Sequence, residues 1–329
     1  MAKRSAPVLN YSLRPAKNIE RKMMAEAFGR LAAICPLSQY RYIGFGSEFF
    51  NDFALFHQVL GIHDMTSIER DDTRLARCAF NRPYKCVKLV HGDSRAILPT
   101  LAWTKRSIVW LDYTDGLNKA ILEDAALLVS QVRSGSVLVW TVNVHPAGDD
   151  RRDQEAAVEQ AGQLPDKRLS QLKERVGENR VRTELKGSEL AQWGLAAESY
   201  RILREEIDRA LGDRNGTAPE EERLAFKQCL HFRYRDGQRM LTVAGVLVNN
   251  ADAARLGKGA FKGLRFVREG EEPAVIAPPT LTGREVRHLN RLLPRQGGKL
   301  KRPSWLTAEE RESYQEIYRY YPIFAESEL

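Results

Sequence analysis

The sequence predicts an α/β fold: a doubly wound, mostly parallel seven-stranded sheet with an antiparallel terminal hairpin, a helical insertion and a basic C-terminal extension. Short apolar segments rich in β-branched residues alternate with helical patterns over residues 41–149. Such strands are typical of a parallel sheet covered on both faces. A charged helical stretch interrupts the alternation, and two β-rich runs around Asp236-Gly237 then resume it.

Residues 1–40 are predicted to form a basic helical segment. Its helix begins at Pro15, because proline is favoured at the first helical position, and runs to Leu31. Apolar side chains recur in it at intervals of four residues, at Ile19, Met23, Ala27 and Leu31. This spacing places them on one face, so we expect an amphipathic helix.

Residues 41–149 are predicted to form the α/β core. The predicted strands cover residues 41–44, 65–69, 86–90, 107–111 and 136–142, and the predicted helices cover 48–60, 73–80 and 117–132. Gly61 is expected to end the first of these helices, since glycine adopts the left-handed conformation that terminates helices.

Three further segments follow the core. Residues 150–228 are predicted to be a helical insertion, with helices at 154–161, 166–176 and 188–211 and a loop at 213–219. Residues 229–250 form the closing hairpin of the core sheet, because Asp-Gly favours a tight turn between strands 230–234 and 240–248. Residues 251–329 are a basic C-terminal extension, in which the capping boxes Thr282–Glu285 and Thr307–Glu310 predict two helix starts.

The composition is that of an ordinary globular protein, with 43% hydrophobic and 29% charged residues. No run of 18 apolar residues exists, so we predict no membrane span. The basic start lacks the apolar stretch of a secretory signal. The cysteines form no C-x-x-C pair, which predicts reduced thiols in a cytoplasmic protein and argues against a zinc site; they are Cys35, Cys78, Cys86 and Cys229.

The net charge of +8 is concentrated at the two ends of the chain. Residues 1–30 hold seven Lys and Arg against two Glu, and residues 251–302 hold twelve Lys and Arg against five Asp and Glu. Basic flanks on a slightly acidic centre favour a polyanion, so nucleic acid is the first candidate partner. An acidic protein subunit and ordinary solvated helix faces are the alternatives.

Polar or glycine residues stand at the carboxyl end of each predicted core strand, which is where open α/β sheets bind ligands. The first strand ends in Gly44-Phe45-Gly46-Ser47, and glycines let a backbone turn tightly and approach a ligand. The next three strands end in Glu69-Arg70, Gly92-Asp93-Ser94 and Asp112-Tyr113-Thr114-Asp115. Four such strand ends together predict a nucleotide-like ligand.

With these residues the chain resembles the class I S-adenosylmethionine-dependent methyltransferases, over residues 41–145 and the hairpin 230–248. The resemblance implies S-adenosyl-L-methionine as cofactor, with the glycine loop against its methionine and ribose, Glu69 on the ribose and Asp93 on the adenine. Asp112 and Tyr113 would then face the substrate. The implied cofactor-binding residues are Gly44, Phe45, Gly46, Ser47, Glu69, Arg70, Gly92, Asp93, Ser94 and Asp112.

The chain departs from the family pattern, acidic-x-G-x-G-x-G, at two positions: Tyr42 replaces the acid and Glu48 the third glycine. Glu48 would repel the cofactor's carboxylate if it pointed inward, and would favour the helix dipole if it faced solvent. The fourth strand end is not the N/D-P-P-Y/F box, which argues against methylation of exocyclic base amines. Phe49 breaks the G-x-G-x-x-G motif, so a methyltransferase is favoured over a dinucleotide-dependent dehydrogenase.

The candidate catalytic residues are Asp112, Tyr113, Asp115 and His145. Asp112 or His145 would act as general base for a hydroxyl nucleophile. Alternatively, Asp112, Asp115 and Asn143 would hold a magnesium ion through oxygen ligands. In the purely structural alternative, Asp115-Gly116 is a turn and His145-Pro146 ends a strand.

Two functions are compatible with the sequence. The first is a methyltransferase that acts on nucleic acid or another large polyanion, with the insertion and the basic ends as its substrate surface. The second is a catalytically inactive methyltransferase-like subunit that binds nucleic acid or a protein partner in a larger assembly. Glu69 and Asp93 favour the first, and the altered glycine loop favours the second.

Overall fold

A computed structural model describes residues 14–149, 163–257, 259–295, 300 and 303–322. Its strands form one eight-stranded sheet in the order β3-β2-β1-β4-β5-β7-β6-β8. The strands are β1 (Arg41–Gly44), β2 (Asp64–Glu69), β3 (Val87–His91), β4 (Ser107–Gly116), β5 (Ser136–Asn143), β6 (Ala225–Asp236), β7 (Gln238–Val248) and β8 (Ala274–Ile276).

The predicted doubly wound, mostly parallel sheet is confirmed, with one strand more than the seven predicted. Strands β1 to β5 are parallel, and β7 is antiparallel to both of its neighbours, β5 and β6. The predicted hairpin is also confirmed and turns at Gly237, whose φ is 86°. The additional strand, β8, has three residues and pairs in parallel with β6, so the hairpin does not form the sheet edge.

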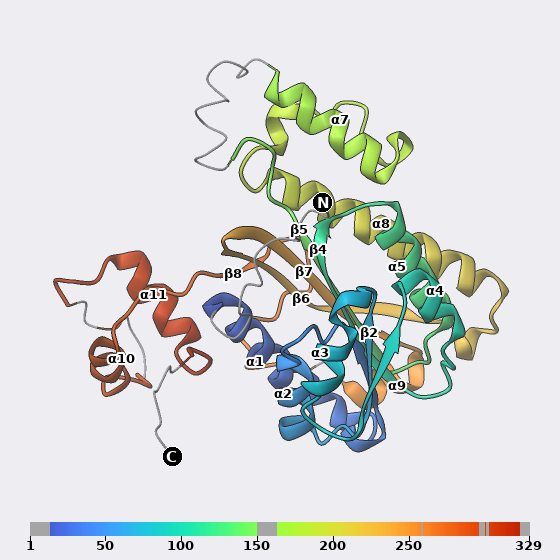
Figure 1. Ribbon diagram of the computed structural model, residues 1–329, viewed down its shortest axis with the longest axis horizontal. Helices are drawn as coiled ribbons and strands as arrows, with labels where there is room; N and C mark the ends of the chain where they lie inside the picture. The colour runs from blue at the N-terminus through green and yellow to red at the C-terminus, as the bar shows by residue number, and fades with distance from the viewer. Residues whose placement is uncertain (1–13, 150–162, 258, 296–299, 301–302, 323–329) are drawn as a thin grey trace.

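The principal helices of the described residues lie on both faces of the sheet and beside its β8 edge (Figure 1). They are α1 (Pro15–Gly29), α2 (Asn51–Leu60), α3 (Leu75–Phe80), α4 (Ser94–Ile97), α5 (Lys119–Gln131), α7 (Leu164–Val176), α8 (Gly194–Thr217), α9 (Asn250–Leu256), α10 (Gly283–Asn290) and α11 (Ala308–Ile317).

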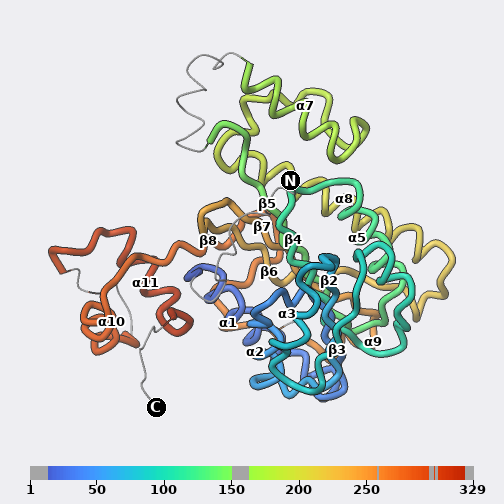
Figure 2. Tube along the Cα trace, in the orientation of Figure 1, coloured from blue at the N-terminus to red at the C-terminus, as the bar shows by residue number. Residues whose placement is uncertain are grey.

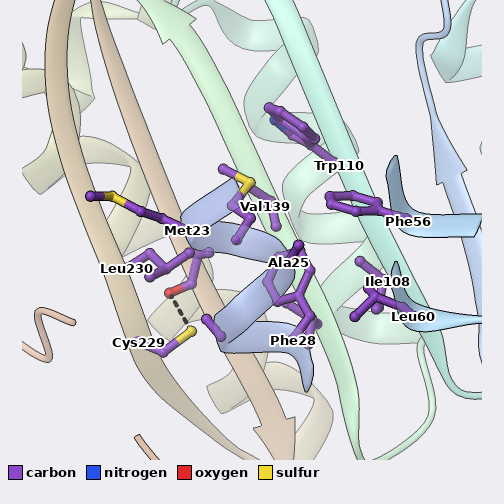
Figure 3. Close-up of a cluster of buried hydrophobic side chains, with 14 of the residues drawn as sticks. Met23, Ala25, Phe28, Phe56, Leu60, Ile108, Trp110, Val139, Cys229 and Leu230 are labelled. Carbon is purple, nitrogen blue, oxygen red and sulfur yellow. Dashed lines mark hydrogen bonds between the residues drawn. The ribbon is translucent and has the colours of Figure 1, made fainter. Parts of the chain in front are cut away.

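Two large apolar cores cover the two sheet faces. In the first, Met23, Ala25 and Phe28 of α1 pack with Phe56 of α2 against residues of the central strands, as Figure 3 shows. The second holds α5, α7 and α8 against the opposite face. The central strands β1, β4, β5 and β7 are therefore buried on both sides over most of their length, which explains their continuous apolar runs, whereas the edge strands β3 and β8 are partly exposed.

Helix α1 is fixed at its first turn by the hairpin. The backbone N–H groups of Ala16 and Lys17 donate to the two carboxylate oxygens of Asp236, at 3.4 and 2.9 Å. Arg14, at the N-cap position, provides no side-chain cap, so an acid from the β6–β7 turn supplies the acceptor that a local Ser or Asp usually provides. This places the start of α1 at the carboxyl edge of the sheet.

The insertion is more helical than predicted. Helix α8 continues to Thr217, so the predicted loop at 213–219 is wrong for most of its length. The reason is tertiary: the Arg214 guanidinium donates to the carbonyls of Val129 and Val132 at 2.7 and 2.8 Å. The predicted helix at 154–161 lies outside the described residues.

The part of the C-terminal extension that contains α10 and α11 forms a lobe beside β8, at the left of the trace in Figure 2, whereas α9 lies apart from it. Both predicted capping boxes are present: Thr282 accepts from the Glu285 N–H at 3.3 Å, and Thr307 accepts from that of Glu310 at 3.1 Å. A small core of Leu289, Leu300, Leu306 and Tyr314 holds α10 and α11 together. Over the described ranges, no helix has the length and apolar character needed to cross a membrane.

Two glycines of α8 differ in how closely the rest of the chain packs against them. A Cβ on Gly194 would lie 1.6 Å from the carbonyl oxygen of Glu189, whereas a Cβ on Gly212 would meet nothing within 4 Å. We expect Gly194→Ala to lower the free energy of unfolding by about 2 kcal/mol, because backbone must move. Gly212→Ala should raise it by about 0.5–1 kcal/mol through helix propensity. Urea denaturation measures both, and equal effects would contradict this packing.

Candidate functional site

The glycine turn after β1 is tightly packed by the chain itself. The Gly46 N–H donates to Ser67 Oγ at 3.1 Å, and a Cβ on Gly46 would lie 2.4 Å from the ring of Phe50. Ser47 and Phe50 have φ values of 50° and 48°, so α2 begins at Asn51 and not at residue 48 as predicted. The glycines therefore have a packing role in addition to the ligand contact that the sequence predicts.

Glu69 ends β2 beside this turn. One carboxylate oxygen accepts the backbone N–H of Asp71 at 2.9 Å, and the other lies 3.8 Å from Cys78 Sγ. The residue is half-buried at the carboxyl edge of the sheet. Arg70, the next residue, is exposed and lies 3.8 Å from Asp115.

Predicted residues from two strand ends meet on Asp124 of α5, and one from a third strand end packs beside them. Ser94 Oγ and the Tyr113 hydroxyl each donate to Asp124 Oδ2 at 2.6 Å. The Phe45 ring packs edge-on against Tyr113 with 5.3 Å between centroids. Burial raises the pKa of both Tyr113 and Asp124 above their ordinary values.

Gly92 and Asp93 connect β3 to α4. Gly92 has a φ of 146°, which only glycine adopts readily, and Asp93 caps α4 by accepting the Arg95 N–H at 3.0 Å. Asp93 itself is exposed. The structure thus brings the predicted adenosyl-binding residues together on the neighbouring ends of β1, β2 and β3.

Strand β4 is longer than predicted and contains the fourth motif. It runs to Gly116, and its register against β5 shifts between Asp112 and Gly116. Asp112, Tyr113 and Asp115 therefore lie within the irregular last part of the strand, whereas the sequence predicted a strand that ends at residue 111. The Asp112 carboxylate accepts from Lys17 Nζ at 2.8 Å. Lys17 is 3% exposed and Asp112 is 25% exposed.

The Lys17 ammonium is the centre of a buried network under α1. It also lies 2.8 Å from Glu20 Oε2 and 3.0 Å from the Tyr234 hydroxyl, and it stands over the Trp110 ring at 4.5 Å. Glu20 is fully buried; burial raises the pKa of its carboxyl, against the lowering effect of Lys17. Thr242 of β7 donates to Glu20, so four elements, α1, β4, β6 and β7, meet in this network.

The side chains of the predicted magnesium site have three different partners. Asp112 accepts from Lys17, Asp115 faces Arg70, and Asn143 Oδ1 accepts the His145 N–H at 2.8 Å. No group of three or more His, Cys, Asp and Glu that could hold a metal ion occurs in the part of the chain that the structure describes. The geometry therefore gives the metal alternative no support.

Comparison with known families identifies the chain. A family model described as "Putative O-methyltransferase" matches residues 9–329. The chain belongs to this family. The resemblance to the class I S-adenosylmethionine-dependent methyltransferases is thereby confirmed, and S-adenosyl-L-methionine is the cofactor of that superfamily. No curated protein matches the chain.

Three solved structures are similar to parts of this chain at low sequence identity. Trm1 from Pyrococcus horikoshii, in complex with S-adenosyl-L-methionine, is 12% identical over 83% of this chain and 67% of that one, with a TM-score of 0.43. The O-methyltransferase TomG from Streptomyces achromogenes is 14% identical over 67% and 78%, with a TM-score of 0.34. MtNAS, in complex with MTA and tNA, is 11% identical, with a TM-score of 0.29. The match covers 38% of this chain and 44% of the MtNAS chain, so this chain spans less than half the length of that protein.

The side chains at the two departures from the superfamily's loop have partners within the chain. Glu48 is buried, and its carboxylate pairs with Arg74 at 3.1 Å and Arg77 at 2.9 Å, so it neither faces solvent nor presents a bare charge. Tyr42 is fully buried, and its hydroxyl donates to Asp52 of α2. An acid is therefore present beside the loop, although it comes from α2 and not from β1.

The sequence analysis missed Lys17, Glu20 and Tyr234, and counted the first two only as surface charge. A signal was available: Lys17, Glu20 and Met23 follow at i, i+3 and i+6, so they share the apolar face that packs on the sheet. The Tyr314 and Tyr320 side chains of the C-terminal extension are buried, while Trp305 is 46% exposed.

Removing the Lys17 ammonium should strongly destabilise the fold. Lys17→Met leaves Glu20 and Asp112 without their counter-charge, so we expect a loss of about 3 kcal/mol in the free energy of unfolding at pH 8. The folded-state pKa of Glu20 lies above the ordinary 4.5 and rises further without Lys17. The loss should therefore shrink as the pH falls through that pKa and Glu20 becomes protonated.

Urea denaturation at pH 8 and pH 4.5 measures this effect. Lys105→Met is the matched control, because Lys105 is 59% exposed and pairs with Asp64 at the surface. We expect its change to be below about 1 kcal/mol at both pH values. A Lys17→Met variant as stable as the control would contradict the buried network.

Proposed function

We propose that the chain is an active S-adenosylmethionine-dependent O-methyltransferase whose acceptor hydroxyl binds beside Asp112. The observation that carries this proposal is the Lys17–Asp112 pair at the carboxyl edge, where a quarter of the Asp112 side chain is exposed while its partner is buried. The adenosyl group would lie along the turn Gly44–Ser47, Glu69 and Asp93. The carboxylates of Glu69 and Asp93, and the edge-on contact of the Phe45 ring with Tyr113, support this placement of the adenosyl group.

The chain's own residues would align the acceptor and accept its proton. S-adenosylmethionine, when bound, supplies an electrophilic methyl group on a sulfonium. Asp112 can accept the hydroxyl proton as that oxygen attacks, and Lys17 holds the carboxylate in place and favours negative charge nearby. His145, which follows β5, is the second candidate base.

Nucleic acid is the acceptor class that the charge distribution favours. Arg284, Arg287 and Arg291 are exposed along α10 and its C-cap, at spacings that place them close to one face. Beside them, the His288 and Trp305 rings contact each other at 6.2 Å, and Trp305 is half-exposed. Basic residues next to an exposed aromatic ring are typical of surfaces that bind single-stranded nucleic acid. In contrast, Lys17 and Arg21 of the basic N-terminal segment are buried.

Methyl transfer tests the catalytic part of this proposal. We expect the wild-type protein to transfer radiolabelled methyl from S-adenosylmethionine to RNA or DNA, and Asp112→Asn to be about 100-fold slower with unchanged cofactor affinity. Asparagine keeps an acceptor for Lys17, so the fold is retained. Asp72→Asn, at an exposed carboxylate, is the control and should be fully active.

Equal rates for Asp112→Asn and the control would exclude Asp112 as the base. Absence of cofactor binding by the wild-type protein at millimolar concentration, measured calorimetrically, would instead favour the inactive, binding-subunit function.

The nucleic-acid surface should show a steep salt dependence. Replacing Arg284, Arg287 and Arg291 together by Ala should weaken binding of single-stranded RNA and reduce the slope of log K against log salt by about 2 to 3. Fluorescence anisotropy between 50 and 200 mM salt measures it. The matched control replaces Arg182, Arg204 and Arg209, which already pair with carboxylates of α8, and should leave the slope unchanged. A flat slope for the wild-type protein would point to a protein partner.

A further inference from the structure

A cavity of about 430 Å³ lies between strand β8 and the end of helix α11, both labelled in Figure 1. Its volume is within the range of about 300–1,000 Å³ that is usual for ligand sites. Strand β8 is at the opposite end of the sheet order from β2 and β3. The cavity is therefore separate from the strand ends that carry Glu69 and Asp93.

The charged side chains that line this cavity are mostly cationic. They are Arg265, Arg268, Arg295 and Arg319, with Glu316 as the acidic one. Arg265 and Arg295 are exposed, and neither guanidinium has an ion pair or a hydrogen-bond acceptor within the described part of the chain. The acidic loop 269–272, which precedes β8, does not line the cavity. Unneutralised guanidinium groups beside a cavity favour an anionic ligand, and their planar forks suit phosphate.

The rest of the lining is largely apolar and aromatic. The Phe266 and Tyr320 rings contact each other edge-on with 5.7 Å between centroids, and both side chains are buried. Tyr318 is half-buried, and Val275 of β8 is 50% exposed. Aromatic and apolar surface next to cations suits a ligand that joins a flat ring to an anionic group. A nucleotide has this chemistry.

The basic surface of α10 continues toward the cavity. Arg284, Arg287 and Arg291 recur at intervals of three and four residues, and Arg295, four positions later, lines the cavity. A polyanion bound along α10 would therefore meet further cations there. This continuity of positive charge favours a nucleic-acid strand over a free mononucleotide, which is too short to use both surfaces. An acidic peptide would satisfy the arginines alone and not the aromatic lining.

We propose that the cavity between β8 and α11 holds one nucleotide of a single-stranded nucleic acid that also binds along α10. Its phosphate would contact Arg265 and Arg295, and its base would lie against Tyr318. This inference rests on the proposed function, because it concerns the same class of acceptor.

Helix α1 relates this cavity to the proposed catalytic base. Met23 lines the cavity, and Lys17, six residues earlier on the same helix, contacts Asp112. Six helical residues span about 9 Å along the axis. The nucleotide in the cavity therefore serves as an anchor, and the methyl acceptor is another nucleotide of the same strand.

A bulkier side chain in the cavity tests whether a base enters it. Val275→Trp should lower the affinity for fluorescein-labelled dodecauridylate about 10-fold, as expected for loss of one stacked base. The slope of log K against log salt should stay unchanged, because no charge is removed. Tryptophan is favoured in strands and Val275 is half-exposed, so the fold is retained. Val59→Trp is the matched control, since Val59 is 59% exposed and outside the cavity, and it should bind as the wild type does.

Removing the free arginines tests the phosphate contact. Arg265→Ala combined with Arg295→Ala should reduce the salt slope by about 1.4, because each phosphate contact to a single strand contributes about 0.7. Arg30→Ala combined with Arg133→Ala is the control, because it removes the same charge from exposed positions outside the cavity and should leave the slope unchanged. Fluorescence anisotropy between 50 and 200 mM salt measures every variant, and unchanged melting temperatures show that they are folded.

The outcomes separate this inference from the proposed function. If Val275→Trp and the Arg265/Arg295 variant bind the RNA as their controls do, the cavity site is refuted while the α10 surface stands. If uridine monophosphate binds the cavity as tightly as dodecauridylate, the anchor is refuted in favour of a free nucleotide. If polyglutamate binds equally tightly and is weakened equally by Val275→Trp, an acidic protein segment is the ligand instead. If the wild-type protein binds no single-stranded RNA, the proposed nucleic-acid acceptor fails and this inference fails with it.

Discussion

The structure depends on one buried cation, the Lys17 ammonium, which holds α1 against the carboxyl edge of the sheet. Two carboxylates, a tyrosine hydroxyl and the Trp110 ring surround it. A lysine in this position is tolerated only because its charge is paired, since an isolated buried ammonium would lose its proton. The same contacts fix the distance between α1 and Asp112, so the geometry of this part of the carboxyl edge follows from a folding requirement.

The acidic residues near the carboxyl edge of the sheet fall into two groups, which differ in their exposure to solvent. Glu69 and Asp93 are accessible at the ends of β2 and β3, while Glu48 and Glu20 are buried and neutralised by cations. The glycine turn is closed by its own aromatic neighbours, so polar contacts to a ligand must come from the flanking helices and strand ends. This arrangement accounts for a loop sequence that departs from the superfamily pattern in a chain that still belongs to a methyltransferase family.

The sequence predicted what local chemistry determines. Apolar β-branched runs located the core strands, Asp236-Gly237 located the hairpin, and Thr282 and Thr307 located two helix starts, because each depends on neighbours in the chain. Tertiary contacts determined what was missed. Arg214 extends α8 by reaching carbonyls of α5, and Glu48 is buried because arginines of α3 meet it. Lys17 looks like a surface residue until Asp112 and Tyr234 are placed beside it. The domain boundaries and the role of each site residue stay predictions.

Helix α1 has a second side, which faces the C-terminal extension. On that side Glu26 accepts from Arg319 at 3.2 Å and from the Tyr320 hydroxyl, and Lys22 donates to the Tyr320 carbonyl at 3.1 Å. One helix thus carries Lys17 on one turn and the attachment of the C-terminal lobe two turns later. Its fifteen residues act as a stiff rod between the two. A displacement of the lobe would therefore be transmitted by α1 to the contact between Lys17 and Asp112.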